Sequence, residues 1–157
     1  MNISVEFGNI IEADTEVIVN AWNRNFIPWF LLIPVGVAGA IKKAAGISPF
    51  NELLFKGPMK TGSAVMTGSG RLPYKAVIHV AGINLLWMAS EQSIRSSVTS
   101  AMNIVREHQF GSVAFPVIGG STGGFSEQRA LDIMLDQLKN EAGDVTVKIV
   151  RFEKNKL

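Results

Sequence analysis

Two stretches of the sequence combine glycines with polar side chains in a way that suits the binding of phosphate groups. In the first, Asn20 and Asn23 follow the apolar run Val17–Val19, and Gly36 and Gly39 come at the start of a helical pattern. A strand, an irregular loop, glycines and a helix N-terminus in this order bring main-chain N–H groups to the carboxyl end of a strand, where they can hold an anion. Gly-x-x-Gly before a helix is common, so this stretch alone does not identify a site.

The second stretch, Phe115–Phe125, also lies between an apolar strand pattern and a helical one. It holds four glycines and two hydroxyl side chains within six residues. Such a loop lets its amides approach an anion closely, although the same composition also suits a flexible connection without a ligand. Two loops of this kind after two central strands would lie side by side, and together they favour a diphosphate ligand.

Other phosphate-binding folds fit the sequence poorly. No Gly-Lys-Ser/Thr closes the second loop, so it is not a P-loop. The dinucleotide fingerprint of a Rossmann fold would follow the first strand, and here it does not. A kinase or NTPase would lack its usual lysine and its Mg²⁺-binding aspartate, and we rank that interpretation low.

Composition indicates one well-packed globular domain over residues 1–157. Hydrophobic residues make up 47% of the chain and charged residues 18%. The formal net charge is +2 with no long basic run, so a nucleic-acid partner is not expected. The absence of cysteine excludes disulfides, thiolate nucleophiles and cysteine-based zinc sites, and we expect neither a metal nor a cofactor. Without a signal peptide at Met1, a cytoplasmic location is expected.

The longest apolar run, Phe26–Val35, is about half the length that a membrane span requires and contains two prolines. It is therefore not expected to cross a membrane. Three interpretations remain open: a loop packed into the core, an apolar wall or lid over a pocket, and a patch for a partner.

Hydrophobic periodicity predicts strands that alternate with helices. The predicted strands are Ile3–Phe7, Thr15–Val19, Gly62–Thr67, Lys75–Val80, Ser112–Phe115 and Val145–Phe152. The predicted helices are Ala38–Ala45, Pro49–Phe55 with Ser48 as N-cap, Ser90–His108 and Glu127–Glu141. This order predicts an α/β fold, a three-layer α/β/α sandwich around a six-stranded mixed, mostly parallel sheet. No helix separates the first two strands, which predicts that an edge strand runs antiparallel.

Five segments stand in order along nearly the whole chain: Val19-Asn20-Ala21-x-Asn23, Gly36-Val37-Ala38-Gly39-Ala40-Ile41, Ala45-Gly46, Ile78-His79-Val80-x-Gly82 and Phe115-Pro116 with its glycine loop. In these motifs and in their order the chain resembles the macro domain family. Gly8-Asn9-Ile10 stands where the family has Gly-Asp-Ile. The resemblance implies binding of ADP-ribose, free or attached to a macromolecule. Some branches remove ADP-ribose from proteins or deacetylate O-acetyl-ADP-ribose, so a hydrolase, a non-catalytic reader and a nucleotide- or RNA-binding scaffold all remain open.

The resemblance also implies roles for individual residues. Asn9 would accept a hydrogen bond from the adenine amino group, with Ile10 beside the ring and Phe152 against it, a contact of about 1 kcal/mol. Ala21 and Asn23 would line the site, and Asn23 would meet the hydroxyls of the distal ribose. The residues implied to hold the two phosphates are Gly36, Val37 and Ala38 in the first loop and Gly119, Gly120, Ser121, Thr122 and Gly123 in the second.

The departures from the family pattern concentrate where a reaction would occur. Ala38 and Gly123 stand where two hydrolytic branches have aspartates, and Trp22 replaces a small residue. Asn23 remains as the catalytic candidate, by orienting a water with help from the substrate's own phosphate. His79 lies mid-strand in an apolar run, which favours a core histidine over an acid or base. Asn20 is expected to brace its turn through hydrogen bonds to the backbone.

Overall fold

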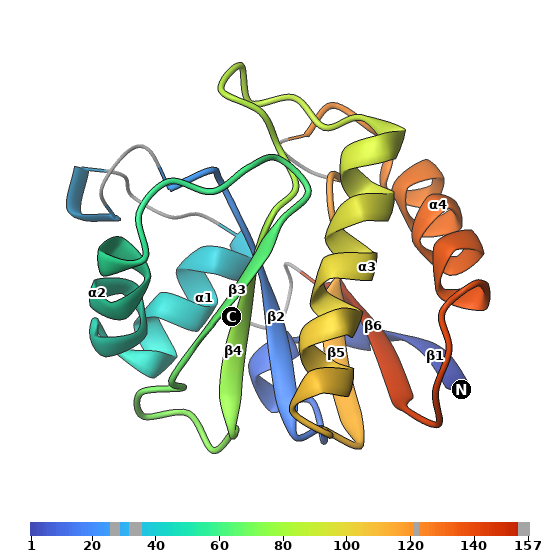
Figure 1. The fold of residues 1–157 in the computed structure, drawn as a ribbon, viewed down its shortest axis with the longest axis horizontal. Helices are drawn as coiled ribbons and strands as arrows, with labels where there is room; N and C mark the ends of the chain where they lie inside the picture. Colours follow the sequence, from blue (N-terminus) through green and yellow to red (C-terminus); the bar gives the residue numbers. More distant parts are fainter. Residues whose placement is uncertain (26–28, 32–35, 121–122, 154–157) are drawn as a thin grey trace.

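A six-stranded sheet lies between two layers of helices in the computed structural model, which describes residues 1–25, 29–31, 36–120 and 123–153 (Figure 1). The strands are β1 (Asn2–Gly8), β2 (Val17–Trp22), β3 (Ala64–Thr67), β4 (Ala76–Ala81), β5 (Ser112–Pro116) and β6 (Thr146–Phe152). The helices are α1 (Gly36–Ala45), α2 (Ser48–Phe55), α3 (Glu91–Glu107) and α4 (Glu127–Lys139), with 3₁₀ turns η1 (Ile10–Glu12) and η2 (Trp29–Leu31). The predicted three-layer α/β/α sandwich is confirmed.

The strand order is β1-β6-β5-β2-β4-β3, and only the β3–β4 pair within this sheet is antiparallel. An antiparallel edge strand is present, but its inference from the opening pair of strands was wrong. The first two strands are not neighbours, because β6 and β5 lie between them. β1 pairs in parallel with the last strand of the chain, a long-range choice that a local pattern cannot specify.

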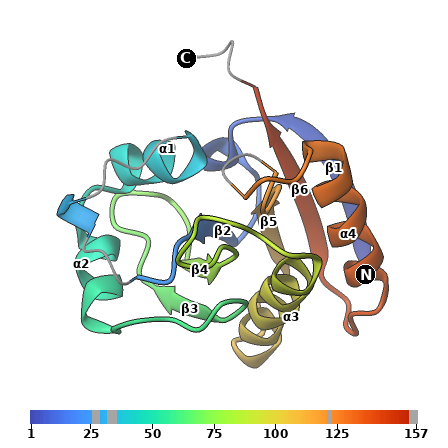
Figure 2. The same ribbon diagram turned by 90° about the horizontal axis from the view of Figure 1, so that it is seen from above.

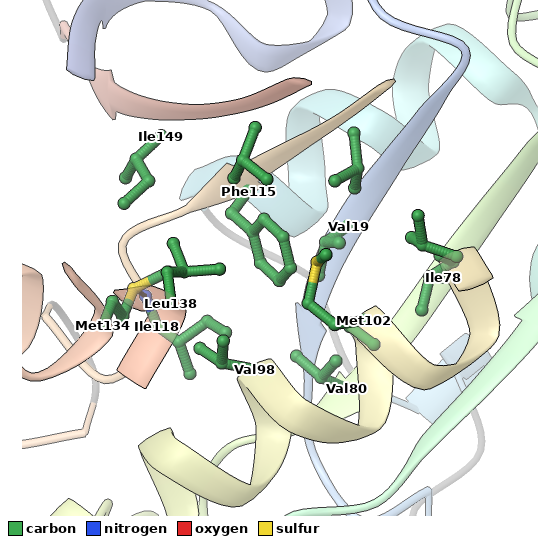
Figure 3. Packing of buried hydrophobic residues seen from close by; sticks show 14 of the residues in the cluster. Val19, Ile78, Val80, Val98, Met102, Phe115, Ile118, Met134, Leu138 and Ile149 are labelled. Carbon is green, nitrogen blue, oxygen red and sulfur yellow. Dashed lines mark hydrogen bonds between the residues drawn. The ribbon is translucent and has the colours of Figure 1, made fainter. Parts of the chain in front are cut away.

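The sheet is buried on both faces. In β2, Val17 and Val19 belong to the apolar cluster beneath α3 and α4, whereas Ile18 and Trp22 belong to the cluster beneath α1 and α2. Figure 3 shows the first cluster, in which Phe115 lies among side chains from both the strands and the helices. Burial on both faces explains why the central strands read as continuous apolar runs rather than alternating ones.

Local side-chain caps set the starts of α3 and α4 but not that of α2. Ser90 and Ser93 form a reciprocal capping box at the start of α3, and the Ser126 hydroxyl accepts from the amide of Arg129 at the start of α4. The predicted cap at Ser48 was wrong by one residue, since Ser48 is already helical and Ile47 precedes the helix without a side-chain cap. Among the described residues no helix has the length and apolar character that crossing a membrane requires.

Candidate functional site

The carboxyl ends of parallel strands meet at one edge of the sheet, and the predicted site residues follow those ends. Neighbouring pairs along β1-β6-β5-β2-β4 are all parallel, so their ends lie side by side (Figure 2). In sheet order, the segments that leave this edge begin at Asn9, Glu153, Val117, Asn23 and Gly82. Segments that are far apart in the sequence therefore form one row, at the edge where open α/β sheets bind their ligands.

At one end of this row, the pairing of β1 with β6 brings Asn9 and Phe152 together. The register places Gly8 beside Phe152, and Asn9 is the next residue along the chain. The Asn9 side-chain oxygen accepts from the amide of Ile11 at 3.3 Å and so caps η1. An amide oxygen can accept two hydrogen bonds, so one remains for a ligand. Phe152 is half-buried and keeps a surface on which a flat ring can lie.

Ile10 lies deeper than the proposed adenine contact requires. The residue is 1% exposed and packs in the core cluster beneath α1. Its carbonyl oxygen accepts from the hydroxyl of Tyr74 at 3.1 Å and from the amide of Ala13 at 3.2 Å. Its contact with an adenine ring stays a prediction, for which this burial leaves little surface.

The glycine turn after β5 is closely packed. A Cβ on Gly123 would lie 2.8 Å from both the Gly119 Cα and the Ala89 Cβ, so the two ends of the turn touch each other and the segment before α3. The Gly123 carbonyl accepts from the Ala89 amide at 2.8 Å. The amide of Gly120 lies 3.4 Å from the Val117 carbonyl, a long hydrogen bond. Ser121 and Thr122 lie outside the described residues, and their predicted phosphate contacts stay predictions.

Next to this turn, the segment after β2 leads to the N-terminus of α1. The first amides of the helix, those of Gly36, Val37 and Ala38, have no acceptor within the helix, and the helix dipole adds positive potential there. The sequence contains no aspartate or glutamate between Glu16 and Glu52. The helix N-terminus therefore carries no acidic side chain of its own that would repel an anion. Residues 32–35, which precede Gly36, lie outside the described part of the chain.

Asn23 lies directly after β2, on the other side of the β5 exit from Phe152. Its side-chain oxygen accepts from the amide of Asn25 at 2.6 Å, and the side chain is partly exposed. Ala21, on the opposite face of β2 from Asn20, is partly buried against the cluster beneath α3. Both residues lie at the carboxyl end of β2, at the edge of the sheet where the site is expected. Their contacts with a ligand stay predictions.

His79 is a core residue, as its strand pattern predicted. It is fully buried, its Nδ1 lies 3.1 Å from Asn20 Nδ2, and its Nε2 lies 2.8 Å from Thr67 Oγ1. Because Asn20 Nδ2 can only donate, Nδ1 accepts and Nε2 carries the proton that is donated to Thr67. Burial lowers the pKa of His79 to about 3, and Lys56 adds to this shift. His79 is therefore neutral, and both of its ring nitrogens are engaged by core side chains rather than available as an acid or base.

The expectation for Asn20 was wrong. Its side chain binds His79 on the neighbouring strand rather than the backbone of its own turn, and its Oδ1 is buried with no partner among the described residues. Asn20 and His79 are paired in the β2–β4 register, so the two side chains meet across the strands. This pairing follows from strand order, which is not visible in the segment around Asn20.

The large side chains after β2 divide between core and surface. Trp22 is 5% exposed and packs edge-on against Phe50, with ring centroids 5.3 Å apart, so it belongs to the core. Phe30 and Leu31 are 61% and 69% exposed, so a core role is wrong for these two. Residues 26–28 and 32–35 of the apolar run lie outside the described part of the chain, and the choice between wall and partner patch stays open.

Asn25 was not foreseen as a site residue. It is 6% exposed and adopts a left-handed backbone with φ of 59°. The available signal was a third asparagine in the segment, because asparagine is among the few residues that tolerate this conformation. The described residues contain no group of three His, Asp or Glu side chains able to hold a metal ion.

A sequence profile described as "Macro domain" matches residues 19–134, a span that includes most of β2, helices α1 to α3, the glycine turn after β5 and the first part of α4. The chain belongs to the Macro domain family.

Two relatives of this macro domain have different names. A macro domain-containing protein of Caldanaerobacter subterraneus subsp. tengcongensis is 33% identical over 92% of this chain and 83% of its own length. A protein of Shigella flexneri named O-acetyl-ADP-ribose deacetylase is 37% identical over 82% of this chain and 72% of its own length. Similarity at this level covers most of both chains in each case.

Solved structures agree with the fold of this macro domain. A variant of the Oceanobacillus iheyensis macrodomain, solved with ADPR, superposes with a TM-score of 0.82 at 28% identity, covering 96% of this chain and 84% of that one. A Trypanosoma brucei macrodomain in complex with ADP-ribose has a TM-score of 0.83 at 21% identity, covering 98% of this chain and 65% of that one. The second likeness supports the fold alone.

Proposed function

We propose that this macro domain binds ADP-ribose, free or as a mono-ADP-ribosyl group on a macromolecule. The observation that carries the proposal is the order of the row at the sheet edge. Asn9 and Phe152 at β1 and β6 suit adenine, the turn after β5 and the N-terminus of α1 suit the two phosphates, and Asn23 after β2 suits the distal ribose. This order matches the order of groups along an ADP-ribose molecule. The ADPR-bound Oceanobacillus iheyensis structure gives independent support.

Titration calorimetry with ADP-ribose, ADP and AMP tests the proposal. We expect ADP-ribose to bind at least tenfold more tightly than AMP, a difference of about 1.4 kcal/mol, because AMP lacks one phosphate and the distal ribose. Equal affinity for ADP-ribose and AMP would contradict it.

Hydrolysis of an ADP-ribosyl bond is the second candidate, and the hydrogen-bonded side chain of Asn23 at the exit of β2 favours it. In this reaction water would add to the anomeric carbon of the distal ribose, the bond to the carrier's oxygen would break, and the water's proton would pass to the departing carboxylate. The chain has no carboxylate between residues 16 and 52 to act as a base, so turnover would depend on positioning and would be modest.

Release of label from a mono-ADP-ribosylated protein distinguishes an enzyme from a reader. Loss of release in Asn23→Ala, measured at a concentration at which the variant still binds ADP-ribose, would support the hydrolase. If the parent protein releases no label even at high concentration, the result would support a non-catalytic reader. A nucleotide- or RNA-binding scaffold, the cytoplasmic location and the oligomeric state stay open predictions.

A further inference from the structure

The turn after β2 is fastened to helix α2 by one buried side chain. Asn25 Nδ2 donates to the carbonyl oxygen of Leu53 at 2.8 Å and to that of Gly57 at 2.9 Å. Leu53 lies in the last turn of α2, where its carbonyl also accepts from the amide of Lys56, and Gly57 lies two residues past the end of the helix. Asn25 is 6% exposed, so these hydrogen bonds are shielded from water.

A second fastening lies one residue earlier. Arg24 Nε donates to the Met59 carbonyl at 2.8 Å, and the amide of Met59 donates to the Arg24 carbonyl at 2.7 Å. Met59 follows α2 and is 3% exposed, and Leu53 and Phe50 of α2 are 1% and 0% exposed. The turn is thus held both by the last turn of α2 and by the segment that follows it.

The same residue that grips α2 also determines how the Asn23 amide is turned. The Asn25 main-chain N–H points at Asn23 Oδ1 with an N···O distance of 2.6 Å, and the left-handed backbone of Asn25 brings it there. A backbone N–H can only donate, so the atom that it meets on Asn23 must be the oxygen. The NH₂ group of Asn23 therefore takes the other direction, and the structure gives it no acceptor among the described residues.

We propose that Asn25 is a positioning residue that fixes the Asn23 side chain with its NH₂ group toward the distal ribose. This inference rests on the proposed function for its ligand. It assigns Asn23 the role of a hydrogen-bond donor to an oxygen of the ligand, a ribose hydroxyl or the oxygen that links the ribose to its carrier. A donor that is already oriented loses less conformational entropy on binding than a mobile one. Asn25 contributes to affinity by reducing this entropy loss.

The test uses Asn25→Gly, Asn23→Ala and the double variant, each titrated with ADP-ribose and with ADP. Glycine adopts the left-handed backbone without cost, so Asn25→Gly removes only the side-chain grip on α2. We expect this variant to bind ADP-ribose five- to tenfold more weakly and ADP within twofold of the parent, because ADP lacks the distal ribose. In the Asn23→Ala background, Asn25→Gly should cause no further loss, since its effect passes through Asn23.

The matched control is Gln109→Gly. Gln109 also has a left-handed backbone, with φ of 58°, but it is exposed at the end of α3 and has no place in the row. ADP-ribose affinity should not change in this variant. Equal losses for ADP and ADP-ribose in Asn25→Gly, or additive losses in the double variant, would overturn the inference and indicate general loosening. If the parent protein does not prefer ADP-ribose to ADP, the distal-ribose part of the proposed function fails instead.

Hydrogen exchange tests the role of Asn25 without any ligand. The main-chain amide at position 25 should exchange its hydrogen at least tenfold faster in Asn25→Gly and in Asn23→Ala than in the parent, because each substitution opens the contact with Asn23 Oδ1. An unchanged exchange rate in Asn25→Gly would show that the side-chain grip does not hold the turn.

Discussion

Asn9 places a neutral amide where the Macro domain family usually has a carboxylate. The Asn9 oxygen caps η1 and keeps one acceptor position at the end of β1, beside Phe152. A carboxylate can make both contacts and would strengthen each with its charge, including the favourable interaction with the helical turn that it caps. In the proposed site, Asn9 would therefore bind an adenine amino group less strongly than an aspartate would.

Restoring the charge should tighten adenine binding. We expect Asn9→Asp to improve the affinity for AMP and ADP-ribose by about 1 kcal/mol, or roughly fivefold, because hydrogen bonds to charged acceptors are stronger. Calorimetry with both ligands measures the change. Inosine monophosphate is the matched control ligand, since its carbonyl oxygen replaces the amino group and should be bound more weakly by the variant. A similar gain for both nucleotides would mean that the residue does not meet the amino group.

At the scale of elements, the site depends on how closely neighbouring loops approach each other. Gly82 follows β4, and a Cβ at this position would lie 2.6 Å from Ile118 Cγ2, which belongs to the turn after β5. Ile118 is fully buried and its amide donates to Met134 Sδ at 3.3 Å, so it cannot easily move away. Because Gly82 has no side chain, the end of β4 can pack directly against Ile118 in the turn that is proposed to hold a phosphate.

We expect Gly82→Ala to lower the free energy of unfolding by about 1–3 kcal/mol through overpacking. Urea unfolding followed by circular dichroism measures this. Gly68→Ala is the matched control, because the nearest atom to a Cβ there is Glu52 Oε1 at 3.7 Å, an ordinary contact. Equal changes in the two variants would show that the approach of Gly82 to Ile118 is not restrictive.

At the scale of the whole molecule, a chain of buried hydrogen bonds crosses three strands. Asn20 on β2, His79 on β4 and Thr67 on β3 are linked in that order, and the Thr67 hydroxyl also lies 3.0 Å from the Gly68 carbonyl. These hydrogen bonds form together only if His79 is neutral, because its Nδ1 must accept the hydrogen bond from Asn20. Folding therefore excludes the proton that an exposed histidine would take up below neutral pH.

This exclusion predicts how stability depends on pH. The folded pKa of His79 is about 3 and its ordinary value is 6.5, so in this window the unfolded state binds more protons and acidification favours unfolding. From pH 7 to 5.5 the free energy of unfolding should fall by about 1 kcal/mol, as measured by urea titrations at each pH.

His79→Gln should lower stability but flatten this pH dependence. His108→Gln is the matched control, since His108 ends α3 at the surface, where its ring stacks on Phe110, and this variant should keep the slope of the parent. A slope that survives in His79→Gln would assign the proton uptake to another group.

The sequence by itself determined the layers of the fold and the positions of its two glycine-containing loops. Alternation of apolar strand and helix patterns predicted the sandwich. The glycines around Gly36 and Gly119, each after an apolar strand and before a helix, predicted loops whose main chain can face an anion. These properties are local, because dihedral preference and side-chain periodicity act over a few residues.

Only the tertiary structure decided which residues meet across the sheet. The pairing of β1 with β6 brings Asn9 near Phe152, although the two residues lie at opposite ends of the sequence. The β2–β4 register places Asn20 beside His79, so its side chain binds His79 rather than the backbone of its own turn. The grip of Asn25 on Leu53 likewise joins a loop to a helix more than twenty residues away. Such contacts follow from strand order and packing, which are set by the whole chain together, so no single segment of the sequence contains them.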